Sequence, residues 1–190
     1  RLCPMEESTQ SRQRPGWDEY FMNIAIVVAG RSSCSARQVA AIVVKDKRIV
    51  STGYNGTPRN TKNCNEGGCE RCAKRTLATA GQNLGECTCS HGEENAIVQA
   101  AYHGIALKNG TLYTTFSPCL TCAKMIINAG IREVVYNATY PLGDRSFELL
   151  REAEIIVRKF ESNRSYDEVL KTFVAELPAT QPTQPQQTLI

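Results

Sequence analysis

The sequence lacks several features that would place a chain of 190 residues in other classes of protein. It contains no apolar run of the roughly 18–20 residues that a membrane-spanning helix needs; the longest candidate is NIAIVVAG, at residues 23–30. Residues 1–16 have no apolar core, so they do not resemble a secretory signal. The formal net charge is only +3, whereas nucleic-acid-binding proteins usually carry a larger, clustered excess. We therefore expect neither a membrane nor a nucleic acid as partner.

Cysteine, in contrast, is abundant. Nine cysteines occur in a chain that shows no export signal, so metal ligation is a better interpretation than a disulfide framework. The odd count also fits metal ligands with spare thiols better than complete pairing. A reducing compartment follows, and we expect the cytoplasm, with the nucleus or an organelle left open.

The hydrophobic pattern indicates one layered α/β domain at residues 17–177, between a mobile lead at 1–16 and a disordered tail at 178–190. A first helix at 17–32 precedes a hairpin with strands at 39–45 and 48–53. Residues 54–90 form a cysteine-rich insertion with little periodicity, which needs an outside source of order. The remaining elements alternate: helices at 92–104, 119–129, 143–153 and 165–177, and strands at 111–115, 133–137 and 154–160.

Two short motifs begin two of these helices. In CSHGEEN, His91 is followed by Glu93, and in SPCLTC, Cys119 and Cys122 lie three residues apart. One nitrogen and two sulfur ligands form a zinc site with an open fourth position, as catalytic sites require. Glu93 lies only two residues after His91, so the two side chains cannot easily point at the same metal ion. The Glu93 carboxylate can instead reach a metal-activated water and transfer protons. The alternative is that Glu93, like Glu94, is only an acid favoured by the helix dipole.

The combination H-x-E and P-C-x-x-C is the signature of zinc nucleobase deaminases. With GYNGTPRNTKNC, NAGIREVVY and VVYNATY, residues 17–160 resemble the deoxycytidylate (dCMP) deaminase family of the cytidine deaminase-like superfamily. The resemblance implies a three-layer α/β/α domain with a mixed sheet of about five strands. It also implies hydrolysis of dCMP to dUMP and ammonia, which supplies dUMP for thymidylate synthesis.

The same resemblance implies roles for individual residues. Glu93 would protonate N3 of the cytosine and then the leaving amine. Asn55 would contact the sugar of the substrate, and the backbone N–H of Gly92 would contact the base carbonyl. Ser117 would contact the amino group, and Tyr140 would lie near the base and the phosphate. Gly92 departs from the family, which usually has alanine there, and we expect this glycine to loosen the start of the helix.

A second, structural zinc would order the cysteine-rich insertion, because closed sulfur sites contribute folding energy. Family resemblance favours Cys34 and Cys64 as two of its ligands. The sequence leaves the other two undecided among Cys69, Cys72, Cys87 and Cys89, and spare thiols remain the alternative. Cys3 is expected to be unligated.

Other functions remain possible on the sequence alone. A polynucleotide deaminase acting on RNA or single-stranded DNA would share the zinc chemistry, but it needs a basic channel and stacking aromatics. A catalytically silent zinc module for assembly would not need Glu93. Cytidine or another pyrimidine nucleotide could replace dCMP. The resemblance further implies a homohexamer that dCTP activates and dTTP inhibits.

Overall fold

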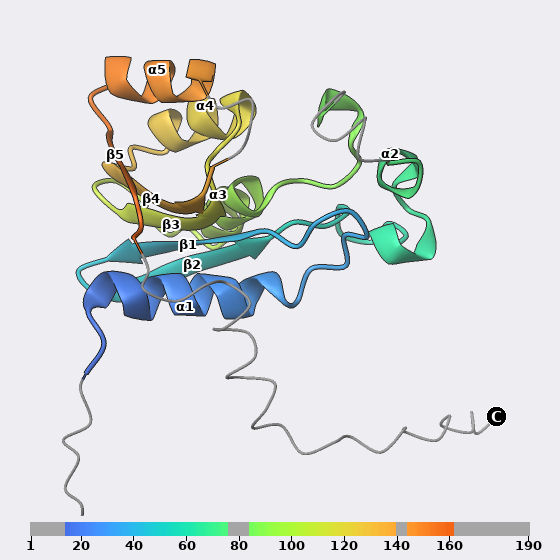
Figure 1. Ribbon diagram of the computed structural model, residues 1–190, viewed down its shortest axis with the longest axis horizontal. Coiled ribbons are helices and arrows are strands. Elements are labelled where there is room, and N and C mark those ends of the chain that lie inside the picture. Colours follow the sequence, from blue (N-terminus) through green and yellow to red (C-terminus); the bar gives the residue numbers. More distant parts are fainter. Residues whose placement is uncertain (1–13, 76–83, 140–143, 162–190) are drawn as a thin grey trace, which may run out of the picture.

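The computed structural model describes residues 14–75, 84–139 and 144–161 (Figure 1). The predicted helix at 165–177, the tail at 178–190 and most of the lead lie outside these residues. No helix in the described ranges is long and apolar enough to span a bilayer. The elements, in chain order, are α1 (Trp17–Ala29), β1 (Ala40–Lys45), β2 (Arg48–Tyr54), η1 (Cys64–Glu66), α2 (Glu70–Ala73), η2 (Leu84–Glu86), α3 (Gly92–Tyr102), β3 (Thr111–Phe116), α4 (Leu120–Asn128), β4 (Glu133–Ala138), α5 (Asp144–Glu152) and β5 (Ile156–Lys159).

The strands form one mixed sheet in the order β2-β1-β3-β4-β5. The β1–β2 hairpin is antiparallel and β1 also pairs antiparallel with β3, whereas the β3–β4 and β4–β5 pairs are parallel. The parallel pairs are joined through α4 and α5, as crossover connections require. Five strands in a mixed sheet agree with the prediction.

Helices cover both faces of the sheet, which gives the predicted three layers (Figure 1). On one face, α1 packs Met22 and Ile26 against Ile42 of β1 and Val135 of β4. Ile24 and Val28 of α1 are partly buried and pack against the same cluster. On the other face, α3, α4 and α5 bury their small and branched side chains against β1, β3 and β4: Ala96, Ala100, Ala123, Ile126, Leu150, Val43, Leu112 and Val134.

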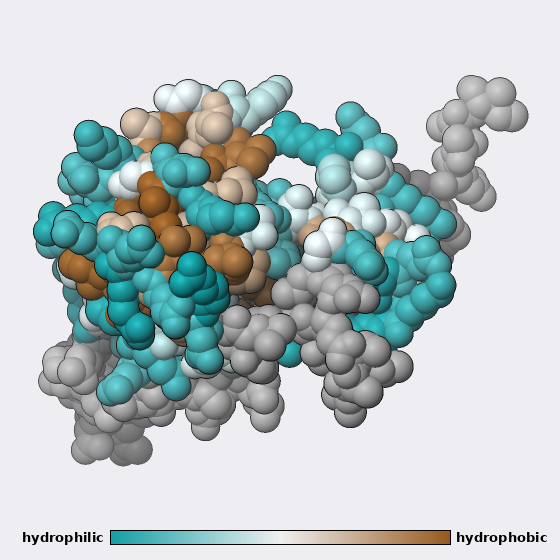
Figure 2. All heavy atoms as spheres, turned by 90° about the horizontal axis from the view of Figure 1, so that it is seen from above, coloured by the Kyte–Doolittle hydropathy of each residue, from teal (hydrophilic) through white to brown (hydrophobic). Residues whose placement is uncertain are grey.

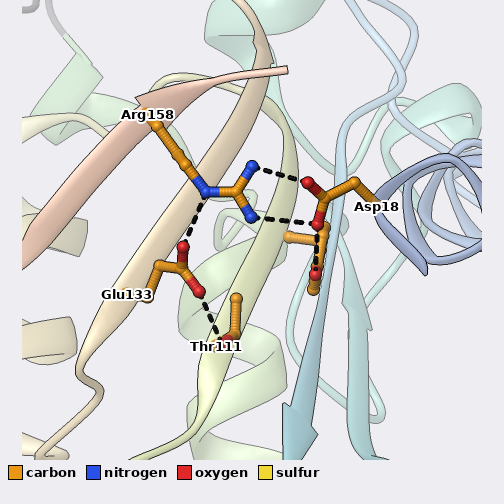
Figure 3. Close-up of polar contacts among 5 residues, drawn as sticks. Asp18, Thr111, Glu133 and Arg158 are labelled. Atoms are coloured by element: carbon orange, nitrogen blue, oxygen red, sulfur yellow. Dashed lines mark hydrogen bonds and ion pairs between the residues drawn. The ribbon is translucent and has the colours of Figure 1, made fainter. Parts of the chain in front are cut away.

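An ion-pair network fixes α1 to the far edge of the sheet (Figure 3). The guanidinium of Arg158 on β5 donates to both Asp18 oxygens, at 2.6 and 2.9 Å, and its Nε donates to Glu133 at 2.6 Å. The hydroxyls of Tyr113 and Thr111 donate to Asp18 and Glu133, respectively. These contacts join the first described helix to the last strand, 140 residues apart in sequence.

The cysteine-rich segment lies beyond the end of the sheet and is built differently from the rest of the domain (Figure 1). It contains the short helices η1, α2 and η2, although its lack of periodicity predicted a loop. Seen from the side of α4 and α5, hydrophobic residues gather over the left half of the molecule, whereas the right half, which carries this segment, is mostly hydrophilic (Figure 2). The buried cluster in this segment consists of cysteines, with Ala36 packed against them.

Candidate metal and catalytic site

The start of α3 positions one candidate ligand and two acids. His91 is the N-cap residue, and its backbone N–H donates to Oε2 of Glu94 at 2.6 Å. Glu94 therefore caps the helix, as Glu and Gln do at the third helical position. Glu93 points elsewhere, because its side chain is only 3% exposed and faces the metal ligands. The helix thus separates two adjacent glutamates into a capping residue and a buried residue.

The start of α4 supplies the two sulfurs. Cys119 is the N-cap residue and Cys122 lies one turn further on, fully buried. The preceding residue, Pro118, is also buried, and its carbonyl accepts a hydrogen bond from Ser146 of α5 at 2.8 Å. The Ser146 hydroxyl therefore fixes the turn that presents Cys119. The sequence did not suggest this contact, since α5 is separated from the motif by β4.

The three ligand atoms have the spacing of a tetrahedral zinc site. Nδ1 of His91 lies 3.4 Å from each sulfur, and the two sulfurs of Cys119 and Cys122 are 3.6 Å apart. Zinc bonds of about 2.0 Å to nitrogen and 2.3 Å to sulfur give a nitrogen–sulfur edge of about 3.5 Å and a sulfur–sulfur edge of about 3.8 Å in a tetrahedron. The three residues form one metal-binding group, and within the described part of the chain no fourth ligand joins it. The donor set therefore fits zinc with an open fourth position.

The protons on these ligands explain how the site accepts a cation. The contacts of the Cys119 sulfur with the Cys122 sulfur and with Nδ1 of His91 lower the pKa of Cys119 to about 4. The contact with Cys119 raises the pKa of His91 to about 9. The contact between the two sulfurs, together with burial, raises the pKa of Cys122. Zinc requires a neutral imidazole nitrogen and thiolates. Metal binding at neutral pH therefore displaces protons from His91 and Cys122.

Glu93 has the environment of a proton-transfer group. Burial raises the pKa of its carboxyl above the usual range. Oε2 lies 3.7 Å from the Cys122 sulfur, on the side of the ligands, while the Thr114 hydroxyl is 3.1 Å from Oε1. Thr114 of β3 is fully buried and was not predicted; its only sequence signal was a polar residue within a strand pattern, three residues before SPCLTC. A three-ligand group with an adjacent buried carboxyl has the composition of a catalytic zinc site.

The other predicted substrate contacts remain predictions. The Asn55 side chain is buried and holds its own loop: its amide donates to the Arg37 carbonyl at 2.7 Å and its oxygen accepts from Val39 N–H at 2.9 Å. Ser117 is buried beside the motif, and its N–H donates to the Ala138 carbonyl. Tyr140 lies outside the described residues.

Gly92 is present at the predicted site for a different reason from the one expected. A Cβ on this residue would lie 2.8 Å from the Cα of Ala40 and 3.1 Å from the backbone nitrogen of Ala41. The glycine therefore lets α3 begin close against β1, whereas the sequence had suggested only a looser helix start. Gly53 of β2 allows a similar approach on the other side, with 2.2 Å between its hypothetical Cβ and the Ala96 nitrogen.

All six loop cysteines converge, although the sequence predicted four ligands among them. They form two overlapping groups of four sulfurs: Cys34, Cys64, Cys72 and Cys89, and Cys69, Cys72, Cys87 and Cys89. None of the cysteines in the described ranges is in a disulfide. Cys34 and Cys64 fall in the same group, in keeping with their pairing in the prediction.

Comparison with known proteins places the chain in a family. Residues 15–138 match the cytidine and deoxycytidylate deaminase zinc-binding region, and the chain belongs to this family. Deoxycytidylate deaminase of Saccharomyces cerevisiae is 43% identical over 159 residues, which cover 84% of this chain and 49% of the yeast protein. That of Schizosaccharomyces pombe is 43% identical over 150 residues, covering 79% of this chain and 46% of its own. The chain thus spans about half the length of these fungal relatives.

A solved structure has the same fold. The dCMP deaminase from the cyanophage S-TIM5, crystallised in complex with dCMP and dUMP, superposes with a TM-score of 0.64 at 32% sequence identity. The match covers 78% of this chain and 99% of the phage protein. The three-layer cytidine deaminase-like fold predicted from the sequence is therefore confirmed.

Proposed function

We propose that this domain hydrolyses dCMP to dUMP and ammonia with a zinc ion held by His91, Cys119 and Cys122. One observation carries the proposal: the buried Glu93 carboxyl lies beside a three-ligand group that has the spacing of zinc. The fungal relatives named deoxycytidylate deaminase and the phage enzyme crystallised with dCMP and dUMP support the choice of substrate.

The residues divide the work of the reaction. Zinc, when bound, polarises water and lowers its pKa toward neutrality. Glu93 would take one proton of the attacking water on Oε2 and pass it to N3 of the cytosine as the oxygen adds at C4. It would then take the second proton from the hydroxyl on C4 and pass it to the leaving amine, so that C4 becomes a carbonyl as ammonia departs. The raised pKa of Glu93 suits this role, because a group that both accepts and donates protons works best near the operating pH. Thr114 holds Oε1, so Oε2 stays on the ligand side.

Further parts of the proposal rest on family resemblance. They are substrate contacts by Asn55, Gly92, Ser117 and Tyr140, a structural zinc in the cysteine-rich insertion, assembly as a hexamer, activation by dCTP and inhibition by dTTP. The convergence of six reduced cysteines supports the structural zinc and a reducing compartment such as the cytoplasm. Light scattering of the purified protein and rate measurements with each triphosphate test the assembly and the effectors.

The test of the reaction is a substrate panel with the zinc-loaded chain: dCMP, CMP, deoxycytidine and single-stranded DNA. Chromatography and ammonia release should show turnover of dCMP, with dUMP as product, and a much lower kcat/KM for the others. Zinc removal should abolish turnover, and zinc addition should restore it. A preference for DNA that falls steeply with salt would instead support the polynucleotide alternative. Turnover of none of the four substrates by zinc-loaded protein would support the silent module.

A further inference from the structure

We propose that the six loop cysteines hold two zinc ions in one binuclear thiolate cluster, in which Cys72 and Cys89 bridge the metals. This inference rests on the structural zinc of the proposed function and adds a second ion beside it. Cys34 and Cys64 complete the ligands of one ion, and Cys69 and Cys87 complete those of the other.

The overlap of the two sulfur groups is the first argument. Each group contains four sulfurs that all lie within 4.8 Å of one another, and Cys72 and Cys89 belong to both groups. Two tetrahedral ions have eight coordination positions, and two shared sulfurs reduce the ligands needed to six. The cluster supplies six cysteines, so every sulfur is used and every position is filled.

The distances fit metal coordination in both halves. The sulfur of Cys72 lies 3.8 Å from that of Cys34 in one half and 3.7 Å from that of Cys87 in the other. Cys69 and Cys87 are also 3.7 Å apart. A tetrahedral zinc ion with bonds of about 2.3 Å separates its sulfurs by about 3.8 Å. The sulfur–sulfur distances in both halves therefore match those expected around a zinc ion.

A single ion would leave two of the six sulfurs unligated inside the cysteine-rich segment. If it took the Cys34 group, Cys69 would remain as a fully buried thiol; if it took the other, Cys64 would remain, only 2% exposed. The segment has little apolar core to replace the metal, because its buried cluster consists of cysteines with Ala36 beside them. Two ions would link the segment around Cys34, helices η1 and α2, and the segment Cys87–Cys89 into one unit.

Donor groups lie around three of the six sulfurs and would stabilise their thiolates. Backbone N–H groups of Cys72 and Thr88 hydrogen-bond to the Cys69 sulfur, and the N–H of Cys89 bonds to the Cys87 sulfur. The Ser35 hydroxyl lies 3.5 Å from the sulfur of Cys64. Such second contacts orient metal ligands and offset their negative charge. All-sulfur tetrahedral sites select zinc or an iron–sulfur cluster, and four-cysteine iron–sulfur clusters would again leave two sulfurs unused.

The test begins with metal analysis of the full chain, expressed with zinc and purified without chelators. We expect three zinc ions per chain, one at the catalytic site and two in the cluster, with no iron or inorganic sulfide. Two zinc ions would overturn the binuclear cluster, one would also remove the structural zinc, and iron with sulfide would replace zinc by an iron–sulfur cluster. Cys119→Ser should lower the count from three to two and abolish dCMP turnover, which separates failure of the cluster from failure of the proposed reaction.

Two matched variants locate the ions. In a binuclear cluster, Cys34→Ser and Cys87→Ser should each lose one zinc ion. With a single ion, one of these variants should keep its full zinc content, because its cysteine is not a ligand. Cys3→Ser, at a cysteine predicted to be unligated, serves as the control.

X-ray absorption of the unmodified protein gives a readout that does not depend on the folding of any variant. It should show a zinc–zinc scattering path in addition to the zinc–sulfur shell. A spectrum with no metal–metal path would overturn the bridged arrangement.

Discussion

The Thr114 hydroxyl lies 3.1 Å from Oε1 of Glu93 and 2.9 Å from the carbonyl oxygen of Phe116. A hydroxyl has one proton, so it donates to only one of these acceptors at a time. When Glu93 is ionised, Thr114 donates to the carboxylate. When Glu93 is protonated on Oε2, its Oε1 is a weaker acceptor, and Thr114 can donate to the carbonyl oxygen of Phe116 instead. The hydroxyl therefore has a partner in both protonation states that the reaction requires.

Replacement of Thr114 by valine should affect the pH dependence of the reaction. The hydrogen bond from Thr114 lowers the pKa of Glu93 and opposes the effect of burial. Its loss raises that pKa further, so the acid limb of the kcat/KM profile should move to higher pH. We expect kcat to fall about 10-fold or more, since a hydrogen bond to a charged group contributes about 1.5–3 kcal/mol.

Two variants control for the loss of packing. Thr114→Ser retains the hydroxyl and should keep the acid limb close to its original pH. Thr52→Val makes the same change at an exposed position of β2 and should have little effect on kcat or on the acid limb. An unchanged acid limb in Thr114→Val would mean that Thr114 supports the strand but does not act on Glu93.

The adjacent glutamates provide a test of the proton-transfer role. Glu93→Gln should lower kcat by about 100-fold to 10,000-fold while the zinc content stays the same, because the amide cannot carry the proton. Glu94→Gln should change kcat only a few-fold, because an amide oxygen can still accept the His91 N–H. Appreciable dCMP turnover by the Glu93 variant, or equal losses in both, would remove Glu93 from its assigned role.

The ion pair between Asp18 and Arg158 should make part of the stability depend on pH. The hydrogen bonds from Arg158 lower the pKa of Asp18 in the folded chain. The stabilisation is therefore fully present above the unfolded pKa of about 3.9 and is lost as the pH falls through the lower folded value. Because both side chains are more than one third exposed, we expect Asp18→Asn to cost only about 0.5–1 kcal/mol at pH 7.

Urea unfolding of the Asp18 variant and the original chain, between pH 7 and pH 3, measures this difference. The zinc ligands are protonated in acid in both proteins, so only the difference between the two curves is informative. Glu148→Gln breaks a more exposed pair with Arg145 and should cost less at every pH. A difference that stays constant down to pH 3 would show that the Asp18 carboxylate charge does not contribute.

The sequence predicted those parts of the site that lie within short motifs. His91, Glu93, Cys119 and Cys122 were identifiable because each motif fixes its own spacing and lies at the start of a helix. Thr114 and Ser146 were not predicted, because their roles arise when β3 and α5 pack against the motifs, and nothing local marks such contacts. Four of the six loop cysteines were predicted to bind a structural zinc ion, but the division of all six into two groups depends on how three separate segments meet.

The close packing around Gly53 and Gly92 also arises from tertiary structure and could not be predicted from the sequence. The fold presses the start of α3 between β1 and β2, so that neither glycine has room for a Cβ. Gly53→Ala should cost about 3 kcal/mol or more, since the added carbon would lie 2.2 Å from the Ala96 nitrogen, and it should weaken zinc binding by displacing His91. Gly92→Ala should cost about 1–3 kcal/mol, although it brings the sequence closer to the family pattern.

Urea unfolding at a fixed zinc concentration measures these costs, and Gly16→Ala is the control. A Cβ at Gly16 would meet nothing within 4 Å, so this variant should lose less than about 1 kcal/mol. If Gly92→Ala proves as stable as the control, β1 and α3 separate readily, and the close approach does not explain the glycine. If Gly92→Ala is destabilised but keeps its zinc content and its kcat, the close approach of α3 to β1 supports the fold and does not affect the reaction. The backbone N–H that is predicted to contact the base is retained in Gly92→Ala, so this comparison tests the packing role of the residue alone.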